Sequence, residues 1–523
     1  MNIRRSSRLS SGPRALALLL LAAALAAGCR PSAPEAAAPP EPDTWPTQGW
    51  QAVAPEAQGF DSAKLAEGLL GMQADGTRVH SLMMIRDGYA LLDTTFYPYD
   101  GSTVHDLASV TKSFMTTLIG IAADQGLIDL DAPLVSYFPD RTIANLDERK
   151  QAVTIRDLVS LTSGLECNPA GDEQDLAAMR ATDDWVQAAL DRPSVAAPGT
   201  RFVYCGPDMH LLSGVLRQAT GMTALEFARA NLFGPLGITE AVWDTDPQGN
   251  NRGWGDLALL PEDAAKLGLL FLQGGKWEGK QIVSSEWVAE ATKAQHPTGA
   301  NWAEDYGYGW WVSREGEAVP YYSANGRGGQ YVRVFPGINA IVATTGGGFS
   351  NAASVTDYLG AAIGDLEKPL PENPQGVAQL EAAVETVNRP PAAQPVPPQP
   401  EMASAISGRT YTFEPSPMPI ESVRFEFDES EQAIFYLKVG GEQATREFPV
   451  GLDGVYRIGL REDGLMQGAR GAWSDADTFV VDYDEIAGID AWTMTLDFQD
   501  DAVKLQMVSP STPGLFKLQG RAE

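Results

Sequence analysis

The chain has 523 residues, which is too long for one compact core and predicts two folded units with tails. Its formal net charge is -30, from 68 acidic and 38 basic side chains. Nucleic acid and anionic lipid surfaces are therefore poor partners for the folded body, because neither attracts it electrostatically. Hydrophobic residues make up 44% of the chain, which is typical of a globular protein.

The first 29 residues have the pattern of an export signal. A basic start is followed by an unbroken Ala/Leu run at 15–27, which is too short to span a bilayer. The ending Leu-Ala-Ala-Gly-Cys resembles the lipobox of bacterial lipoproteins, which implies lipidation of Cys29. We expect an exported protein, lipid-anchored in a bacterial cell envelope and facing the periplasm. A plain secretory signal cut nearby is the alternative.

Pro-rich segments divide the rest of the chain. Residues 30–45 form a Pro/Ala tether, and a second such stretch at 388–400 follows a helix within a linker at 367–402. This organisation predicts a large unit at 46–366 and a small one at 403–523.

The large unit mixes helices and strands. A helix capped at Asp61 or Ser62 comes first, and two strands around an Asp87-Gly88 turn follow. After a long helical stretch, two further strands flank a turn at Gly337, and a helix closes the unit. This order predicts an α+β fold with a helical insertion. The small unit alternates apolar and polar residues, which predicts a β-barrel or β-sandwich.

The segment from Leu107 to Ala123 carries one charge, Lys112, among apolar and uncharged side chains. It predicts a buried helix, on which residues three apart are neighbours, so Ser109 lies beside Lys112. A buried lysine must be partnered or lose its proton, and a hydroxyl beside it becomes nucleophilic without histidine. A core helix whose lysine reaches solvent at its edge is the alternative.

Two further segments supply candidate partners for Ser109. Between Pro198 and Leu216, a turn and a short extended piece place Tyr204 in a loop before a helix that restarts near Met209. A phenol there can pass a proton, although a packing role is the alternative. Between Ser323 and Pro336, a Gly-rich loop precedes a strand, and a backbone N–H there would form an oxyanion hole with that of Ser109. An ordinary tight loop is the alternative.

In this order and spacing, the three segments resemble the serine beta-lactamase and D-alanyl-D-alanine carboxypeptidase superfamily. The branch is that of class C beta-lactamases, family VIII-like esterases and nylon-oligomer hydrolases. The stretches 153–165, 253–268 and 305–312 are similar to that branch too. The resemblance implies a beta-lactamase/transpeptidase-like fold, with an antiparallel sheet flanked by helices. It implies Ser109 as the acylated nucleophile, Lys112 as the general base and Tyr204 as the proton relay, with no cofactor or metal.

Two elements depart from that family's pattern. The Y-x-N element is Tyr204-Cys205-Gly206, without the amide that contacts a beta-lactam, and the K-T-G element is Ala324-Asn325-Gly326, without Lys or His. Both losses weaken a beta-lactamase assignment and are tolerable for ester or amide hydrolysis. By this alignment the Arg327 N–H completes the oxyanion hole, and its side chain could contact a substrate carboxylate. The predicted substrate contacts are Gly206, Asn325, Gly326, Arg327 and Gly328.

The sequence gives little evidence for other kinds of catalytic or metal-binding site. The chain has no G-x-S-x-G elbow, and its four histidines form no metal-binding pair. Cys167 and Cys205 either pair in an oxidising compartment or stay free and buried. We therefore predict an exported serine hydrolase that cleaves ester or amide bonds of a small-molecule or peptide substrate. The alternative is a non-catalytic or slowly acylated penicillin-binding sensor or scaffold. The sequence leaves the oligomeric state and the role of the small unit open.

Overall fold

The structure, a computed structural model, describes residues 41–299, 302–348, 352–416, 418–428, 430–440, 444–510 and 514–523. The predicted signal peptide with Cys29, and most of the predicted tether, lie outside these residues. Within the described ranges, none of the helices combines the length and the apolar character needed to cross a membrane.

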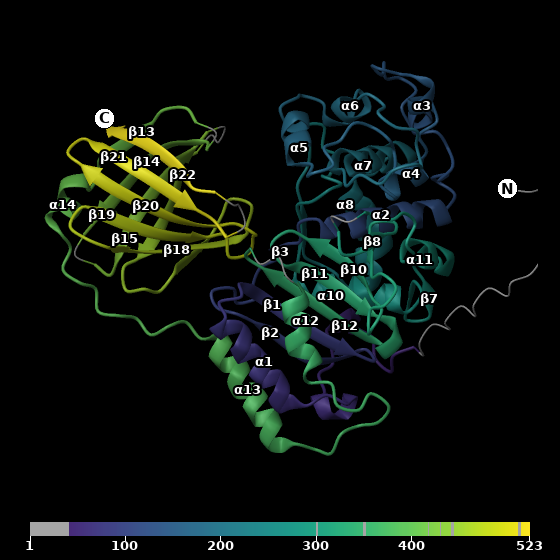
Figure 1. Ribbon diagram of the computed structural model, residues 1–523, viewed down its shortest axis with the longest axis horizontal. Coiled ribbons are helices and arrows are strands. Elements are labelled where there is room, and N and C mark those ends of the chain that lie inside the picture. The colour runs from purple at the N-terminus through teal and green to yellow at the C-terminus, as the bar shows by residue number, and fades with distance from the viewer. Residues whose placement is uncertain are drawn as a thin grey trace, which may run out of the picture. The chain divides into compact units, whose positions relative to one another are not determined.

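A seven-stranded antiparallel sheet forms the centre of the large unit (Figure 1). Its strand order is β2-β1-β12-β11-β10-β9-β8. The strands are β1 (Val79–Arg86), β2 (Tyr89–Thr95), β8 (Asp305–Tyr306), β9 (Trp311–Val312), β10 (Tyr322–Gly326), β11 (Gln330–Phe335) and β12 (Ala340–Gly346). The predicted Asp87-Gly88 turn joins β1 to β2, and both of its residues have positive φ, 51° and 84°.

Successive side chains along each strand point to opposite faces of this sheet, and both faces are buried. Leu82 and Met84 of β1 face one apolar cluster, and Met83 and Ile85 face another. The first cluster is covered by α1 (Ser62–Ala74), α12 (Ala352–Gly360) and α13 (Pro374–Asn388). The second is covered by α2 (Val110–Asp124) and α10 (Pro261–Leu272).

Two helices of the first layer show how sequence signals map onto the fold. α1 begins where predicted, because the Asp61 carboxylate accepts the N–H groups of Ala63 and Lys64. α13 packs against α1 and contributes Leu380 to the same core. Residues 374–388, which the sequence assigned to the linker, are thus packed on the large unit.

The helical insertion lies between β2 and β8, and several of its helices pack against α7. Its helices are α3 (Glu148–Gln151), α4 (Ile155–Val159), α5 (Glu173–Arg180), α6 (Trp185–Leu190), α7 (Gly206–Thr220), α8 (Ala224–Ala228), α9 (Gly234–Leu236) and α11 (Ser285–Ala291). Small sheets are formed by β3 (His105–Asp106), β4 (Ala241–Trp243) and β5 (Leu257–Leu259), and by β6 (Lys276–Trp277) and β7 (Lys280–Gln281).

The small unit is a β-barrel preceded by a short helix, α14 (Glu401–Ile406). Its strands are β13 (Thr410–Phe413), β14 (Ile420–Phe427), β15 (Gln432–Val439), β16 (Arg446–Gly451), β17 (Arg457–Leu460), β18 (Met466–Trp473), β19 (Thr478–Asp484), β20 (Ala491–Gln499), β21 (Ala502–Val508) and β22 (Phe516–Ala522). Pairing of β16 with β18 closes the barrel and leaves β17 outside it. Large apolar side chains such as Phe425, Phe435 and Phe479 fill the interior. The predicted α+β fold with a C-terminal β unit is confirmed.

Candidate active site

Ser109 lies at the N-terminus of α2, where the chain turns sharply. The sequence predicted a helix from Leu107, but α2 begins at Val110 because Ala108 has a left-handed φ of 47°. The Asp106 carboxylate stabilises this turn by accepting the Ala108 N–H at 2.8 Å. As a result the half-buried Ser109 occupies the N-cap position of α2, and its hydroxyl makes no capping hydrogen bond with the helix.

Lys112 lies one helical turn further along α2 and is 3% exposed. Its Nζ is 2.8 Å from the Ser109 Oγ, as the S-x-x-K spacing predicted, and 2.9 Å from the carbonyl oxygen of Trp254. No carboxylate in the described residues forms an ion pair with this Nζ. The Lys112 Nζ is therefore placed within hydrogen-bond distance of the one hydroxyl with which a proton would have to be exchanged.

Tyr204 lies beside Lys112 and is the third candidate catalytic residue. Its ring centroid is 4.6 Å from the Lys112 Nζ, so the loop residue and the helix residue meet although they are far apart in sequence. Among the described residues, the Tyr204 hydroxyl makes no hydrogen bond with Ser109 or Lys112. Hydrogen bonds of catalytic groups are often long before substrate binds, so this geometry is compatible with a proton relay.

Three aromatic side chains pack around the ring of Tyr204. Trp311 stacks on the Tyr204 ring at 5.6 Å between centroids, Trp302 lies at 5.7 Å and Tyr306 meets it edge-on at 6.3 Å. Tyr204 and Trp302 also line a cleft of about 340 Å³. A cleft beside a candidate acid-base group is a candidate binding site for the part of a substrate next to the reacting bond.

The Gly-rich segment meets the other side of Ser109. A Cβ atom on Gly326 would be 2.7 Å from the Leu107 carbonyl oxygen, so only glycine allows the end of β10 to lie against the turn before Ser109. Arg327 follows β10, and its N–H donates to no acceptor in the described residues; the same holds for the N–H of Ser109. Two N–H groups without a described acceptor therefore lie on segments that meet where Gly326 contacts Leu107, and they are candidates for the two donors of an oxyanion hole.

The other predicted substrate contacts are differently placed. The Asn325 side chain is bonded to the Ser323 hydroxyl and to Glu304, and the Arg327 guanidinium donates to Asp490 at 2.9 Å. Gly328 packs under Ile489 of the barrel. A substrate carboxylate at Arg327 would therefore compete with Asp490.

Gly206 is buried at the start of α7, which begins earlier than the predicted Met209. Its N–H donates to the Asp172 carboxylate at 2.5 Å, and a Cβ atom here would lie 2.8 Å from that carboxylate and from Leu176. A larger residue at this position would therefore have to displace the side chains of Asp172 and Leu176.

Cys167 and Cys205 form a disulfide, which the sequence left open. Cys205 directly follows Tyr204 and precedes α7, so the bond ties the loop that carries the phenol to the segment around Cys167. A second constraint comes from the Val203 N–H, which donates to the Leu161 carbonyl oxygen.

We expect removal of this disulfide to destabilise the fold. The cysteines are 38 residues apart, and closing a loop of that size stabilises a protein by about 2–4 kcal/mol. The Cys167→Ala/Cys205→Ala variant should lose this free energy of unfolding in urea titrations, with kcat reduced because Tyr204 is less well held. Wild-type protein kept in dithiothreitol is the control, and equal stability with and without the reductant would contradict the prediction.

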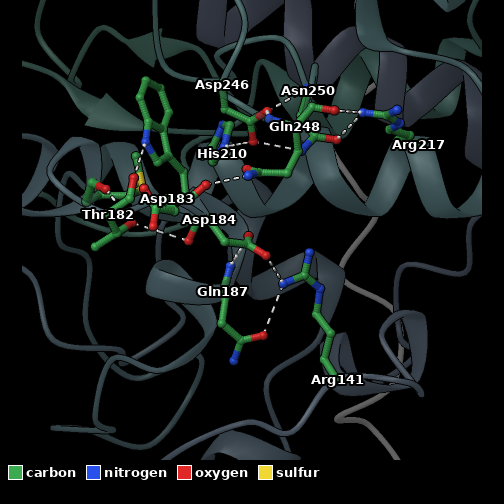
Figure 2. A network of polar contacts seen from close by, with 12 residues as sticks. Arg141, Thr182, Asp183, Asp184, Gln187, His210, Arg217, Asp246, Gln248 and Asn250 are labelled. Carbon is green, nitrogen blue, oxygen red and sulfur yellow. Dashed lines mark hydrogen bonds and ion pairs between the residues drawn. The ribbon is translucent and has the colours of Figure 1, made fainter.

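A buried polar network supports Trp254, the carbonyl partner of Lys112. The Trp254 ring contacts the rings of His210 and Trp185, at 5.2 and 5.8 Å between centroids. His210 pairs with Asp246 at 3.1 Å, and both side chains are fully buried. Figure 2 shows this pair continuing to Asn250 and Arg217, which are joined to it by hydrogen bonds. The network thus packs against the ring of the residue whose carbonyl oxygen accepts from Lys112.

Asp208 of α7 gives the stability of this region a pH dependence. Burial raises the pKa of Asp208 from 3.8 to about 7, although the Ser163 hydroxyl donates to its carboxylate at 2.7 Å. The folded chain therefore keeps a proton between about pH 4 and pH 7 that the unfolded chain releases, so stability falls as the pH rises through this window.

We expect Asp208→Asn to remove this dependence. Relative to wild type, the variant should gain about 2 kcal/mol of unfolding free energy when the pH is raised from 5 to 8. Urea titrations at both pH values measure the difference, and Asp140→Asn, at an exposed position, is the control. A difference between Asp208→Asn and wild type that does not change with pH would contradict it.

Several residues of the site carried no role in the sequence analysis. Trp254 lies in the stretch 253–268, and Tyr306 and Trp311 lie in 305–312, so the resemblance marked both segments without a function. Asp106, which stabilises the turn before Ser109, and Asp490, which pairs with Arg327, had no local signal.

The Beta-lactamase family model matches residues 63–362, more than half of the chain. Penicillin-binding protein 4 from Amycolatopsis lactamdurans is 26% identical over 304 residues, covering 50% of this chain and 77% of that protein. The 6-aminohexanoate-dimer hydrolase from Paenarthrobacter ureafaciens is 25% identical over 193 residues, covering 35% of this chain and 49% of the relative.

The chain is also similar to solved structures. The octameric penicillin-binding protein homologue from Pyrococcus abyssi is 17% identical with a TM-score of 0.45, covering 88% of this chain and 100% of that one. The match of the family model over the large unit decides the assignment, and the family is the one that the three sequence segments resemble. The chain belongs to the beta-lactamase family.

Proposed function

We propose that this chain is an exported serine hydrolase that cleaves ester or amide bonds through an acyl-enzyme on Ser109. The observation that carries the proposal is the 2.8 Å contact between the Ser109 Oγ and the buried Lys112 Nζ, with Tyr204 against the same amine. The relatives' names include a hydrolase, which supports hydrolysis as the reaction class.

In the first half of the reaction, the Lys112 amine accepts the Ser109 proton as the Oγ bonds to the substrate carbonyl carbon. The carbonyl oxygen gains negative charge, which the N–H groups of Ser109 and Arg327 stabilise. Tyr204 then donates its proton to the leaving alcohol or amine and regains one from Lys112. The acyl group remains on Ser109.

In the second half, water takes the place of the leaving group. Tyr204 and Lys112 accept a proton from this water as its oxygen bonds to the acyl carbon. The Ser109–acyl bond breaks, Ser109 recovers its proton from the same pair of residues, and the carboxylic acid leaves. No residue outside this group has to move a proton.

The substrate class follows from the surroundings of Tyr204. Trp302 lines a cleft together with Tyr204 and offers an aromatic surface to a substrate group beside the phenol. The lack of an amide side chain at Gly206 argues against a preference for beta-lactams. A small-molecule or peptide ester or amide therefore fits this site best.

The disulfide supports export, because disulfides persist in oxidising compartments. We propose that the chain is held in the cell envelope by a lipid on Cys29, facing the periplasm. Labelling of intact cells with radioactive palmitate tests the lipidation of Cys29. Wild-type protein that carries no label would overturn the proposal, and Cys29→Ala is the control.

Acylation of Ser109 tests the catalytic proposal. Purified full-length protein is treated with a fluorophosphonate, and p-nitrophenyl butyrate hydrolysis is followed while peptides are analysed by mass spectrometry. We expect one adduct, on the peptide containing Ser109, to form in step with the loss of turnover. Turnover unaffected by complete labelling would contradict the proposal, whereas labelling without any ester turnover would favour a sensor that is acylated and remains trapped.

A further inference from the structure

The turn between β19 and β20 of the barrel, residues 485–490, is buried against the large unit, and Pro40–Glu523 forms one compact body. Ile486 and Ala487 of this β19–β20 turn are 0% exposed and share a cluster with Tyr99, Val104 and Ala258. The Asp106 N–H donates to the Ala487 carbonyl oxygen at 2.9 Å. The turn is therefore held by both apolar packing and a backbone hydrogen bond.

One side of the β19–β20 turn meets the segment that leads to Ser109. The Asp106 that bonds to Ala487 through its N–H uses its carboxylate to accept the Ala108 N–H. Ala108 carries the left-handed φ that places Ser109 at the helix N-terminus. Asp106 thus connects the barrel to the turn that positions Ser109.

The other side of the β19–β20 turn meets the Gly-rich segment. Ile489, 6% exposed, covers Gly328, on which a Cβ atom would be 2.2 Å from the Ile489 Cγ2. Asp490 accepts the Arg327 guanidinium at 2.9 Å, in an ion pair whose side chains are 29% and 47% exposed. The packing of Ile489 is the more important of the two contacts, because a partly exposed ion pair contributes little.

These contacts join the two segments that carry the oxyanion N–H groups. Such groups act only when held within about 0.5 Å of the productive geometry, and rigid neighbours supply that precision. β10 pairs with β9 only at Tyr322 and Ser323, so the end of β10 that leads to Arg327 has β11 as its one strand neighbour among the described residues. The β19–β20 turn supplies a second support.

We propose that the β19–β20 turn is a positioning element of the catalytic centre, in which Ile489 and Asp490 hold the Arg327 N–H in line with that of Ser109. The proposal rests on the proposed function and assigns a role to the barrel in the same reaction. The contacts of Ile489 and Asp490 that carry the proposal are those with Gly328 and Arg327, so the two residues act through these neighbours.

Ile489→Ala in the full-length protein tests the packing. We expect kcat for p-nitrophenyl butyrate to fall by about 10–100-fold with KM changed less than about twofold, since the loss of an oxyanion donor costs kcat. The affinity for butylboronic acid, which forms a tetrahedral adduct with serine, should fall in parallel, and Ile489→Val should restore most of both. Ile420→Ala, at an equally buried position in the barrel core (6% exposed), is the control and should leave kcat unchanged.

Asp490→Asn is the second variant, because it leaves the apolar packing intact. We expect kcat to fall by about threefold to fivefold, as befits a partly exposed ion pair, with recovery in Asp490→Glu. Unchanged kcat and boronate affinity in folded Ile489→Ala, or an equal loss in Ile420→Ala, would overturn the positioning role alone. Ester turnover that survives Ser109→Ala would overturn the proposed function and this inference together.

Discussion

Ser109→Ala is expected to lower kcat/KM for p-nitrophenyl butyrate by at least about 10³-fold while the fold is retained. Alanine removes the oxygen that forms the acyl bond and leaves the Lys112 amine with no proton to accept. The half-buried hydroxyl does not cap α2, so its loss costs the helix little. Steady-state kinetics and urea titration on the same preparation separate the effect on activity from the effect on stability.

Ser113→Ala is the matched control. Ser113 lies one helical turn beyond Ser109 on α2, is 1% exposed and donates its hydroxyl to the Gly309 carbonyl oxygen. The variant should lose about 1 kcal/mol of stability, through one buried hydrogen bond, and keep its activity. Equal loss of activity in both variants would show that α2 is disturbed, and turnover that survives Ser109→Ala would place the nucleophile elsewhere.

Lys112→Met is expected to lower kcat by about 10³-fold, close to the effect of Ser109→Ala, because a serine without its base is a weak nucleophile. Methionine has nearly the same length as lysine and fits a buried site, so packing is maintained. The double variant Ser109→Ala/Lys112→Met should be no slower than either single variant, since the two residues act as one unit. Additive losses would contradict a shared role.

Lys150→Met is the control for the removal of a buried lysine. Lys150 is 1% exposed, and its Nζ donates to the carbonyl oxygens of Ala144 and Leu190, with no part in the candidate site. We expect this variant to lose about 2 kcal/mol of stability, because two carbonyl groups lose their donor, and to retain kcat. A large fall in kcat in Lys150→Met would indicate that buried lysines support activity only through the fold.

Local patterns in the sequence predict the elements whose causes are local. Asp61 precedes α1 and caps it, and Asp87-Gly88 joins β1 to β2, because a side-chain cap and a turn need only adjacent residues. The Ser109–Lys112 contact belongs to the same class, since a spacing of three places both side chains on one side of a helical turn.

Elements that depend on distant partners were predicted less well. The start of α2 was placed too early, because the left-handed φ of Ala108 depends on its contacts with Asp106 and Gly326 rather than on its own preference. The start of α7 was placed too late, because Gly206 begins the helix with its N–H on Asp172. A residue before a helix carries no local sign of such contacts.

By itself the sequence determined that this protein has an α+β unit followed by a β unit, and that Ser109 lies next to Lys112, since composition, periodicity and spacing are properties of neighbouring residues. Only the tertiary structure decided that the Trp254 carbonyl, 142 residues away, is the partner of Lys112, that the cysteines pair, and that Asp490, 163 residues away, meets Arg327. Those contacts form when whole layers pack, because the position of each partner depends on the core between them.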